Sequence, residues 1–129
     1  MGLADPISPD LLLIRTGFYK YRKEDIHTYC HKNPYLSPRA AGYLRKHFPT
    51  LRAIGIDCIS IAYYANRESG RETHKILLKE DGFKGPPVLI IEDLYPPHER
   101  NERDELIVSP IFIEGIDSTP CTVIAILDD

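Results

Sequence analysis

Five short apolar runs are spaced along the chain, and each has the length and the branched aliphatic content of a β-strand. These runs are Leu11–Ile14, Leu51–Asp57, Val88–Glu92, Leu106–Glu114 and Thr122–Leu127. Pro110 interrupts the fourth run. Because proline cannot donate a hydrogen bond to a neighbouring strand, we expect a sheet edge or a bulge at that position.

Two amphipathic stretches separate the first three runs. Ser37 is a good N-cap and Pro38 suits the first helical position, so a helix is expected from Arg39 to about His47. A second helix is expected over Glu72–Glu80. The shared faces of these helices are formed by Ala40, Ala41, Leu44 and Phe48 in the first and by His74, Leu77 and Leu78 in the second. Strands that alternate with helices predict an α/β fold, with a mixed sheet flanked by helices.

Composition narrows the class of protein. The 129 residues suit a single domain over residues 1–129, and the net charge of −3 argues against a nucleic-acid partner, which would require a basic face. No apolar run approaches the ~20 residues that span a bilayer, and no signal peptide is recognisable, so no membrane partner is expected. Cys30, Cys58 and Cys121 are odd in number and far apart, which indicates reduced thiols in a cytoplasmic protein.

His74 and Glu92 are the first candidates for chemistry. A histidine on a helix face and a carboxylate at the end of the following strand can converge on one metal ion, and imidazole with carboxylate suits zinc or manganese. Two ligands are too few for a complete site. The structural alternative is that His74 lies on the flank of its helix and that Glu92 is the first solvent-exposed residue after a buried strand.

A second cluster, His27, Cys30 and His31, has helical spacing and could hold zinc. Its segment is short, polar and followed by Asn33-Pro34, which favours a partly exposed surface helix. Cys58 has no base nearby in the sequence that would activate its thiol, so a buried small apolar residue is the expected role.

Several blocks occur in an order that resembles a known enzyme family. They are LLLIRTGF (11–18), NPYLSPRAAGYL (33–44), AIGIDCISI (53–61), THKILL (73–78), VLIIEDL (88–94) and SPIFIEGIDSTPCTVIAI (109–126). Together they look like the carboxyl-terminal part of the putative cyclase or kynurenine formamidase-like family of metal-dependent hydrolases. The resemblance implies a swivelling β/β/α fold, assembly into dimers or tetramers, and zinc or manganese that activates water against a small amide, formamide or cyclic amide such as N-formylkynurenine.

By position, the resemblance assigns His74 and Glu92 as metal ligands, and it assigns no catalytic residue. The family's main signature, His-x-Gly-Thr-His-x-Asp, would supply the other ligands, and no such string occurs in this sequence. The resemblance therefore implies a fold that is incomplete without the amino-terminal half. The chain is then expected to be a truncated enzyme, an engineered fragment or one half of a split enzyme. Two functions are expected: a metal-dependent hydrolase that needs a chain with the missing motif, or a non-catalytic fragment or subunit that oligomerises through the uncovered surface.

Overall fold

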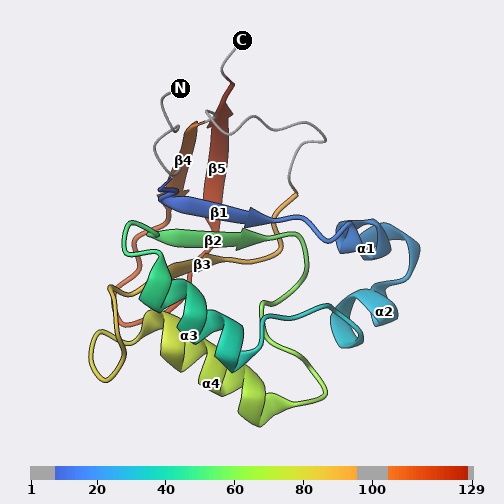
Figure 1. Ribbon diagram of the computed structural model, residues 1–129. Coiled ribbons are helices and arrows are strands. Elements are labelled where there is room, and N and C mark those ends of the chain that lie inside the picture. The colour runs from blue at the N-terminus through green and yellow to red at the C-terminus, as the bar shows by residue number, and fades with distance from the viewer. Residues whose placement is uncertain (1–7, 96–104, 128–129) are drawn as a thin grey trace, which may run out of the picture. The chain divides into compact units, whose positions relative to one another are not determined.

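The computed structural model describes residues 8–95 and 105–127 (Figure 1). The chain divides by its contacts into two units, Met1–Pro96 and Pro97–Asp129, which are taken in turn. The single domain expected over residues 1–129 stays a prediction.

A parallel sheet forms the centre of the first unit. It consists of β1 (Leu11–Ile14), β2 (Ala53–Ile56) and β3 (Leu89–Ile91) in the order β1-β2-β3. β1 has the predicted bounds, whereas β2 and β3 are shorter than their apolar runs. The residues that flank them, such as Asp57 and Glu92, lie in loops at the strand ends, where they are available to a site.

Helices connect the three strands. The segment after β1 contains a 3-10 helix η1 (Phe18–Lys20) and the short helices α1 (Tyr21–Glu24) and α2 (Ile26–His31). The prediction for α3 (Pro38–His47) is confirmed, because the Ser37 hydroxyl accepts a hydrogen bond from the Ala40 amide at 3.2 Å. α3 and α4 (Arg67–Leu78) pack side by side on one face of the sheet (Figure 1).

The bounds and the buried face of α4 differ from the prediction. The helix begins at Arg67, about one turn and a half before the expected start, because the Asn66 side chain accepts from the Ser69 amide at 3.0 Å and caps it. Its buried face is Gly70, Thr73, Ile76 and Leu77. Leu78, expected on the apolar face, is 43 % exposed, because that face is rotated toward Ile76.

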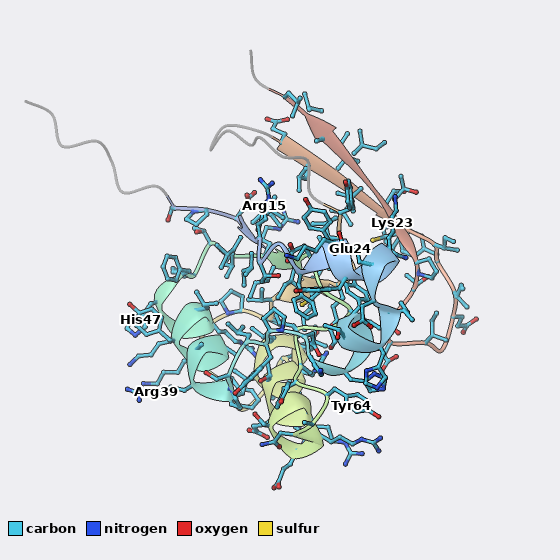
Figure 2. The ribbon with its side chains drawn as sticks, turned by 90° about the vertical axis from the view of Figure 1, so that its right-hand side faces the viewer. Arg15, Lys23, Glu24, Arg39, His47 and Tyr64 are labelled. Carbon is cyan, nitrogen blue, oxygen red and sulfur yellow. The ribbon has the colours of Figure 1, made fainter. Side chains whose placement is uncertain are left out.

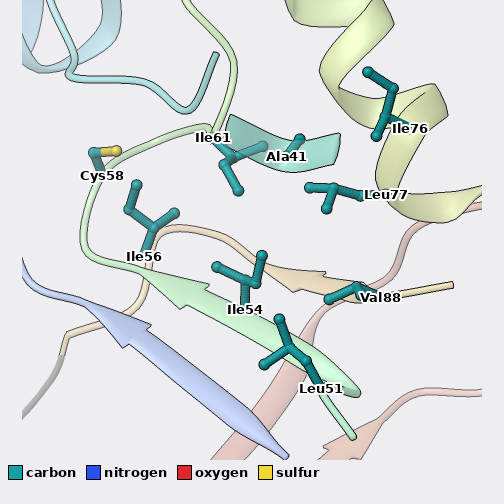
Figure 3. Packing of buried hydrophobic residues seen from close by; sticks show 9 residues of the cluster. All are labelled: Ala41, Leu51, Ile54, Ile56, Cys58, Ile61, Ile76, Leu77 and Val88. Atoms are coloured by element: carbon teal, nitrogen blue, oxygen red, sulfur yellow. The ribbon is translucent and has the colours of Figure 1, made fainter. Parts of the chain in front are cut away.

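The core of the first unit lies between the sheet and the two long helices. Figure 3 shows its nine buried members, which are Ala41, Leu51, Ile54, Ile56, Cys58, Ile61, Ile76, Leu77 and Val88. One buried residue was not expected: Arg45 of α3 is only 1 % exposed. Its guanidinium donates to the carbonyl oxygens of Ile76 and Gly85, so it fastens α4 and the loop before β3 to α3.

The second unit contains an antiparallel pair of strands, β4 (Glu105–Pro110) and β5 (Cys121–Ile126). β4 ends at Pro110, which pairs with Cys121 at the end of the ladder, so the expected continuation of the strand to Glu114 is wrong. Both strands are edges of a two-stranded sheet, as the proline predicted.

The α/β class is confirmed, with parallel and antiparallel pairing in two separate sheets. Within the part of the chain that the structure describes, no helix has both the length and the apolarity needed to cross a membrane.

Candidate metal and substrate site

Loops that follow the three parallel strands converge at the carboxyl edge of the sheet. Asp57, directly after β2, is fully buried and accepts hydrogen bonds from the amides of Thr16 and Gly17 and from the Thr16 hydroxyl, at 2.6–2.8 Å. The Asp93 amide, after β3, donates to the Cys58 carbonyl at 2.8 Å. The carboxyl edge of a parallel sheet is the usual place for a ligand site in α/β proteins.

Glu92 leaves β3 at this edge, and its carboxylate is held by the neighbouring loop. Its Oε1 accepts from the Ser60 hydroxyl and from the Ile61 amide, both at 2.8 Å. The same oxygen lies 3.4 Å from Nε2 of His74. Both side chains are about one-third exposed, at 34 % for His74 and 31 % for Glu92. The structure therefore brings together the two residues that the sequence singled out.

The second ring nitrogen of His74 is engaged within its own helix. Nδ1 lies 2.9 Å from the Gly70 carbonyl oxygen. A carbonyl oxygen can only accept, so Nδ1 carries the proton and donates. In the neutral imidazole this leaves the lone pair on Nε2, the nitrogen that faces Glu92. A backbone partner on one nitrogen is the usual way in which a metal-ligating histidine is oriented.

The electrostatics of the pair favour opposite charges. The contact with Glu92 raises the pKa of His74 above its ordinary value; burial opposes this shift and the Gly70 carbonyl supports it. Burial raises the pKa of Glu92, but hydrogen bonds from His74, the Ile61 amide and Ser60 together lower it more, so this pKa lies below its ordinary value. The pair is thus an ion pair when His74 is protonated, and a pair of facing lone pairs when it is neutral.

The geometry of the pair fits two ligands of one ion. Two donor atoms that each lie about 2.0–2.1 Å from a tetrahedral metal are about 3.4 Å apart. The observed separation between Nε2 of His74 and Oε1 of Glu92 is 3.4 Å. A cation between them would also remove the repulsion of the facing lone pairs. No group of three or more potential ligands is present among the described residues, so the pair by itself is too small for a complete metal site.

The alternative zinc cluster is not assembled. The rings of His27 and His31 stack with their centroids 4.4 Å apart, and Nδ1 of His31 lies 2.9 Å from the His27 carbonyl oxygen. Cys30 does not join them in a group of ligands within the described ranges. The helical spacing does bring the two histidines together. Their rings stack on each other on a short surface helix, and this stacking explains the spacing without a metal. Cys58 is fully buried, and burial raises its pKa to about 11, which agrees with the expected apolar role.

Further residues support the site, and most of them were not predicted. The Asn33 amide nitrogen donates to the carbonyl oxygens of Ser60 and Ala62 at 2.9 and 2.8 Å, which fixes the loop that holds Glu92. Asp93 has a left-handed φ of 56° and accepts from the Tyr29 hydroxyl. The only signal for them in the sequence is that buried strands are followed at once by polar residues.

A pocket of about 530 Å³ opens beside His74. Its wall is formed by α4 and by the loop from Ile59 to Tyr64, and it also includes Cys30 and Asn33. Figure 2 shows Tyr64 beside the end of α4, whereas Arg39 and His47 project from α3 on the opposite side. The size and the largely apolar wall are typical of a site for a small molecule.

Comparison with family models gives one match. The model described as Putative cyclase matches residues 4–63, just under half of the chain. This range contains the first three sequence blocks that carry the resemblance, whereas His74 and Glu92 lie beyond it. No curated protein and no solved structure matches the chain.

Proposed function

We propose, from the match of residues 4–63 to the family model described as Putative cyclase, that this chain supplies His74 and Glu92 to the divalent metal site of an amide hydrolase. The metal is zinc or manganese, which imidazole and carboxylate both suit. The substrate is a small amide, formamide or cyclic amide, of which N-formylkynurenine is an example.

One observation carries the proposal. Nε2 of His74 and Oε1 of Glu92 are 3.4 Å apart, and each is presented by a partner on its far side, the Gly70 carbonyl for the imidazole and the Ser60–Ile61 loop for the carboxylate. Ligands that are fixed before the metal arrives lose less conformational freedom on binding, which favours affinity.

When bound, the metal would activate a water molecule near neutral pH and polarise the amide carbonyl. The residues of this chain orient the two ligands and provide the substrate pocket. The Gly70 carbonyl keeps the proton of His74 on Nδ1, and Ser60 holds one carboxylate oxygen in place. The pocket beside His74 takes the body of the substrate and shields it from water on the side of α4.

The remaining ligands must come from outside the described residues. We propose that they belong to a His-x-Gly-Thr-His-x-Asp motif on another segment or on a second chain, with which this chain pairs. A cytoplasmic location accompanies the proposal, since Cys30, Cys58 and Cys121 are all free thiols.

Isothermal titration calorimetry with zinc tests whether His74 and Glu92 bind a metal ion. The wild-type chain should bind one zinc ion weakly, and His74→Ala and Glu92→Gln should each weaken binding at least about tenfold. His47→Ala is the matched control, because His47 is an exposed histidine of α3 far from the pocket. Equal zinc affinity in the wild type and in His74→Ala would exclude this pair as ligands.

A second experiment tests the reaction. The chain is mixed with a family polypeptide that carries the missing motif, and hydrolysis of N-formylkynurenine is followed with and without added zinc or manganese. Metal-dependent turnover that is lost with His74→Ala supports the hydrolase. Formation of a stable complex that has no turnover with either metal would count against it.

A non-catalytic oligomerising module is the second candidate, and the second unit favours it. Several large apolar side chains of residues 105–127 are exposed, among them Phe112 at 96 % and Leu127 at 60 %. A two-stranded ribbon of this kind is marginal in water unless another surface covers it. Light scattering decides: a dimer or larger species that Phe112→Ser dissociates supports the module, whereas a monomer at all concentrations contradicts it.

A further inference from the structure

The residue that follows Glu92 has a backbone conformation that few side chains adopt, and we infer from it that Asp93 is a positioning residue of the metal site. Its left-handed turn and its anchored carboxylate hold Glu92 against His74. This inference rests on the proposed function, because Asp93 would act on the metal only through Glu92.

The turn at the end of β3 is left-handed at Asp93. Its φ is 56°, and it is the one residue other than glycine with a positive φ within residues 8–95 and 105–127. Residues with a Cβ atom disfavour this region, and aspartate and asparagine tolerate it best. Such a conformation persists only where the surroundings fix it, and it is concentrated at functional sites. The strain at Asp93 therefore indicates a task for this turn.

Two backbone hydrogen bonds tie the turn to the core. The Asp93 amide donates to the Cys58 carbonyl at 2.8 Å, and the Leu94 amide donates to the Ile56 carbonyl at 3.0 Å. A parallel ladder would advance along both chains, so this reversed order marks a change of direction of one chain relative to the other beside Asp93. Cys58 and Ile56 are buried core residues and thus fixed points. Glu92 enters this turn directly from β3.

The Asp93 side chain ties the same turn to the segment after β1. One carboxylate oxygen accepts from the hydroxyl of Tyr29 in α2, and the other lies 3.0 Å from a guanidinium nitrogen of Arg22 in α1. Tyr29 is only 2 % exposed, so its hydroxyl is fixed by packing. A glycine would adopt the left-handed conformation without strain, but it would lack both contacts. The carboxylate therefore explains why aspartate stands here.

A displaced turn would act on the metal ligands through Glu92. Its Oε1 lies 3.4 Å from Nε2 of His74 and accepts from the Ile61 amide at 2.8 Å. A set of ligands works only within about 0.5 Å of its productive geometry. If the turn opens part of the time, the apparent metal affinity falls in proportion to the fraction of molecules that keep the geometry.

Zinc affinities of three variants test the inference. Isothermal titration calorimetry measures them at a temperature at which circular dichroism shows every variant folded. Asp93→Ala should weaken binding about tenfold, because alanine disfavours the left-handed turn by about that factor. Asp93→Asn should stay within about twofold of the wild type, since asparagine tolerates the turn and offers Tyr29 an acceptor. Asp93→Gly keeps the turn and loses the carboxylate, so it should weaken binding about threefold.

Gly82→Ala is the matched control. Gly82 has a φ of 90° in the loop before β3, and a Cβ atom there would meet nothing within 4 Å. Alanine therefore brings the same backbone strain without a clash and away from the site. Gly82→Ala should lose stability in urea, as Asp93→Ala does, and keep the zinc affinity. An equal loss of zinc affinity in both variants would reflect a general loss of stability and overturn the inference.

The Ile61 amide gives a second readout that needs no metal. It donates to Oε1 of Glu92, so its NMR chemical shift in EDTA reports the position of that carboxylate. The shift in Glu92→Ala defines the loss of the acceptor. Asp93→Ala should move the Ile61 signal at least halfway toward that value, and Asp93→Asn should leave it near its position in the wild type. An Ile61 signal that stays in place in Asp93→Ala contradicts the inference.

The two proposals fail separately. Zinc binding that depends on His74 and is the same in the wild type and in Asp93→Ala removes this inference alone. An Ile61 signal that follows the expected pattern in a wild type that binds no zinc removes the metal site and leaves the positioning of Glu92 by Asp93.

Discussion

Gly70 allows α4 to lie close to the loop that holds Glu92. Substitution of Gly70 by alanine tests whether the helix and the loop are in close contact. A Cβ atom at Gly70 would lie 2.8 Å from Cβ of Ala62, whereas ordinary contact begins at 3.4 Å. The helix and the loop would have to separate by about 0.6 Å. Because Ala62 has no flexible side chain to move aside, the backbone itself must shift.

The magnitude follows from two opposing effects. Overpacking of this kind costs about 1–3 kcal/mol. Alanine is a better helix former than glycine by about 0.5–1 kcal/mol, which offsets part of that cost. We therefore expect Gly70→Ala to lower the free energy of unfolding by up to about 2.5 kcal/mol. Gly42→Ala in α3 is the control, since its Cβ would meet nothing within 4 Å, and it should raise the free energy of unfolding by about 0.5–1 kcal/mol.

Urea denaturation followed by circular dichroism measures both changes, and Ala62→Gly completes a double-mutant cycle. Removal of the Ala62 methyl group restores the space, so Gly70→Ala should stabilise the Ala62→Gly background. The coupling energy between the two substitutions should exceed about 1 kcal/mol. Effects that add within about 0.5 kcal/mol would refute the close approach of α4 to this loop.

Three further predictions concern the polar groups at the carboxyl edge. In EDTA, the ion pair should contribute most to the free energy of unfolding between pH 4.5 and 6.5. Its contribution should fall gradually as the pH drops through the lowered pKa of Glu92 and as the pH rises through the raised pKa of His74. Denaturation of the wild type and of His74→Gln at a series of pH values measures this contribution, and a difference between them that does not change with pH would contradict the ion pair. Asp57→Ala should lower the free energy of unfolding by about 2–4 kcal/mol, since three donors lose a buried acceptor, and a loss below about 1 kcal/mol in urea denaturation would contradict this role. Tyr29→Phe should cost about 1–2 kcal/mol in the same assay through loss of the hydrogen bond to Asp93, and an unchanged midpoint would show that water replaces it.

Local patterns predicted the local elements well. The bounds of β1 followed from four apolar residues, and the start of α3 followed from the capping of Ser37 and the fixed φ of Pro38. The start of α4 was missed although Asn66 is an equally good cap, because the first turn after it is polar and lacks the apolar periodicity that marked Glu72–Glu80.

The site was predicted only in part. The types and the order of His74 and Glu92 suggested that they could share a metal ion, and the family resemblance assigned both as ligands. The structure places Nε2 of His74 3.4 Å from Oε1 of Glu92. The partners of Glu92 are 31 and 32 residues away, in the loop after β2, and they reach it only because β2 lies beside β3 in the sheet. A pattern along one chain does not specify that order. The burial of Arg45 was also unpredictable, since it depends on carbonyl groups of α4 and of the loop before β3.

The parallel register of the sheet has a consequence for folding kinetics. Leu11 pairs with Ala53, and Ala53 pairs with Leu89, so every strand contact of the first unit closes a loop of dozens of residues. Such high contact order slows folding, because loop entropy is lost before the contacts form. Within the first unit, β3 is the last strand to leave the ribosome, and Glu92 follows it directly. Completion of the sheet and arrival of the carboxylate at His74 are therefore one event, and a nascent chain cannot present this half of a metal site before its first unit has folded.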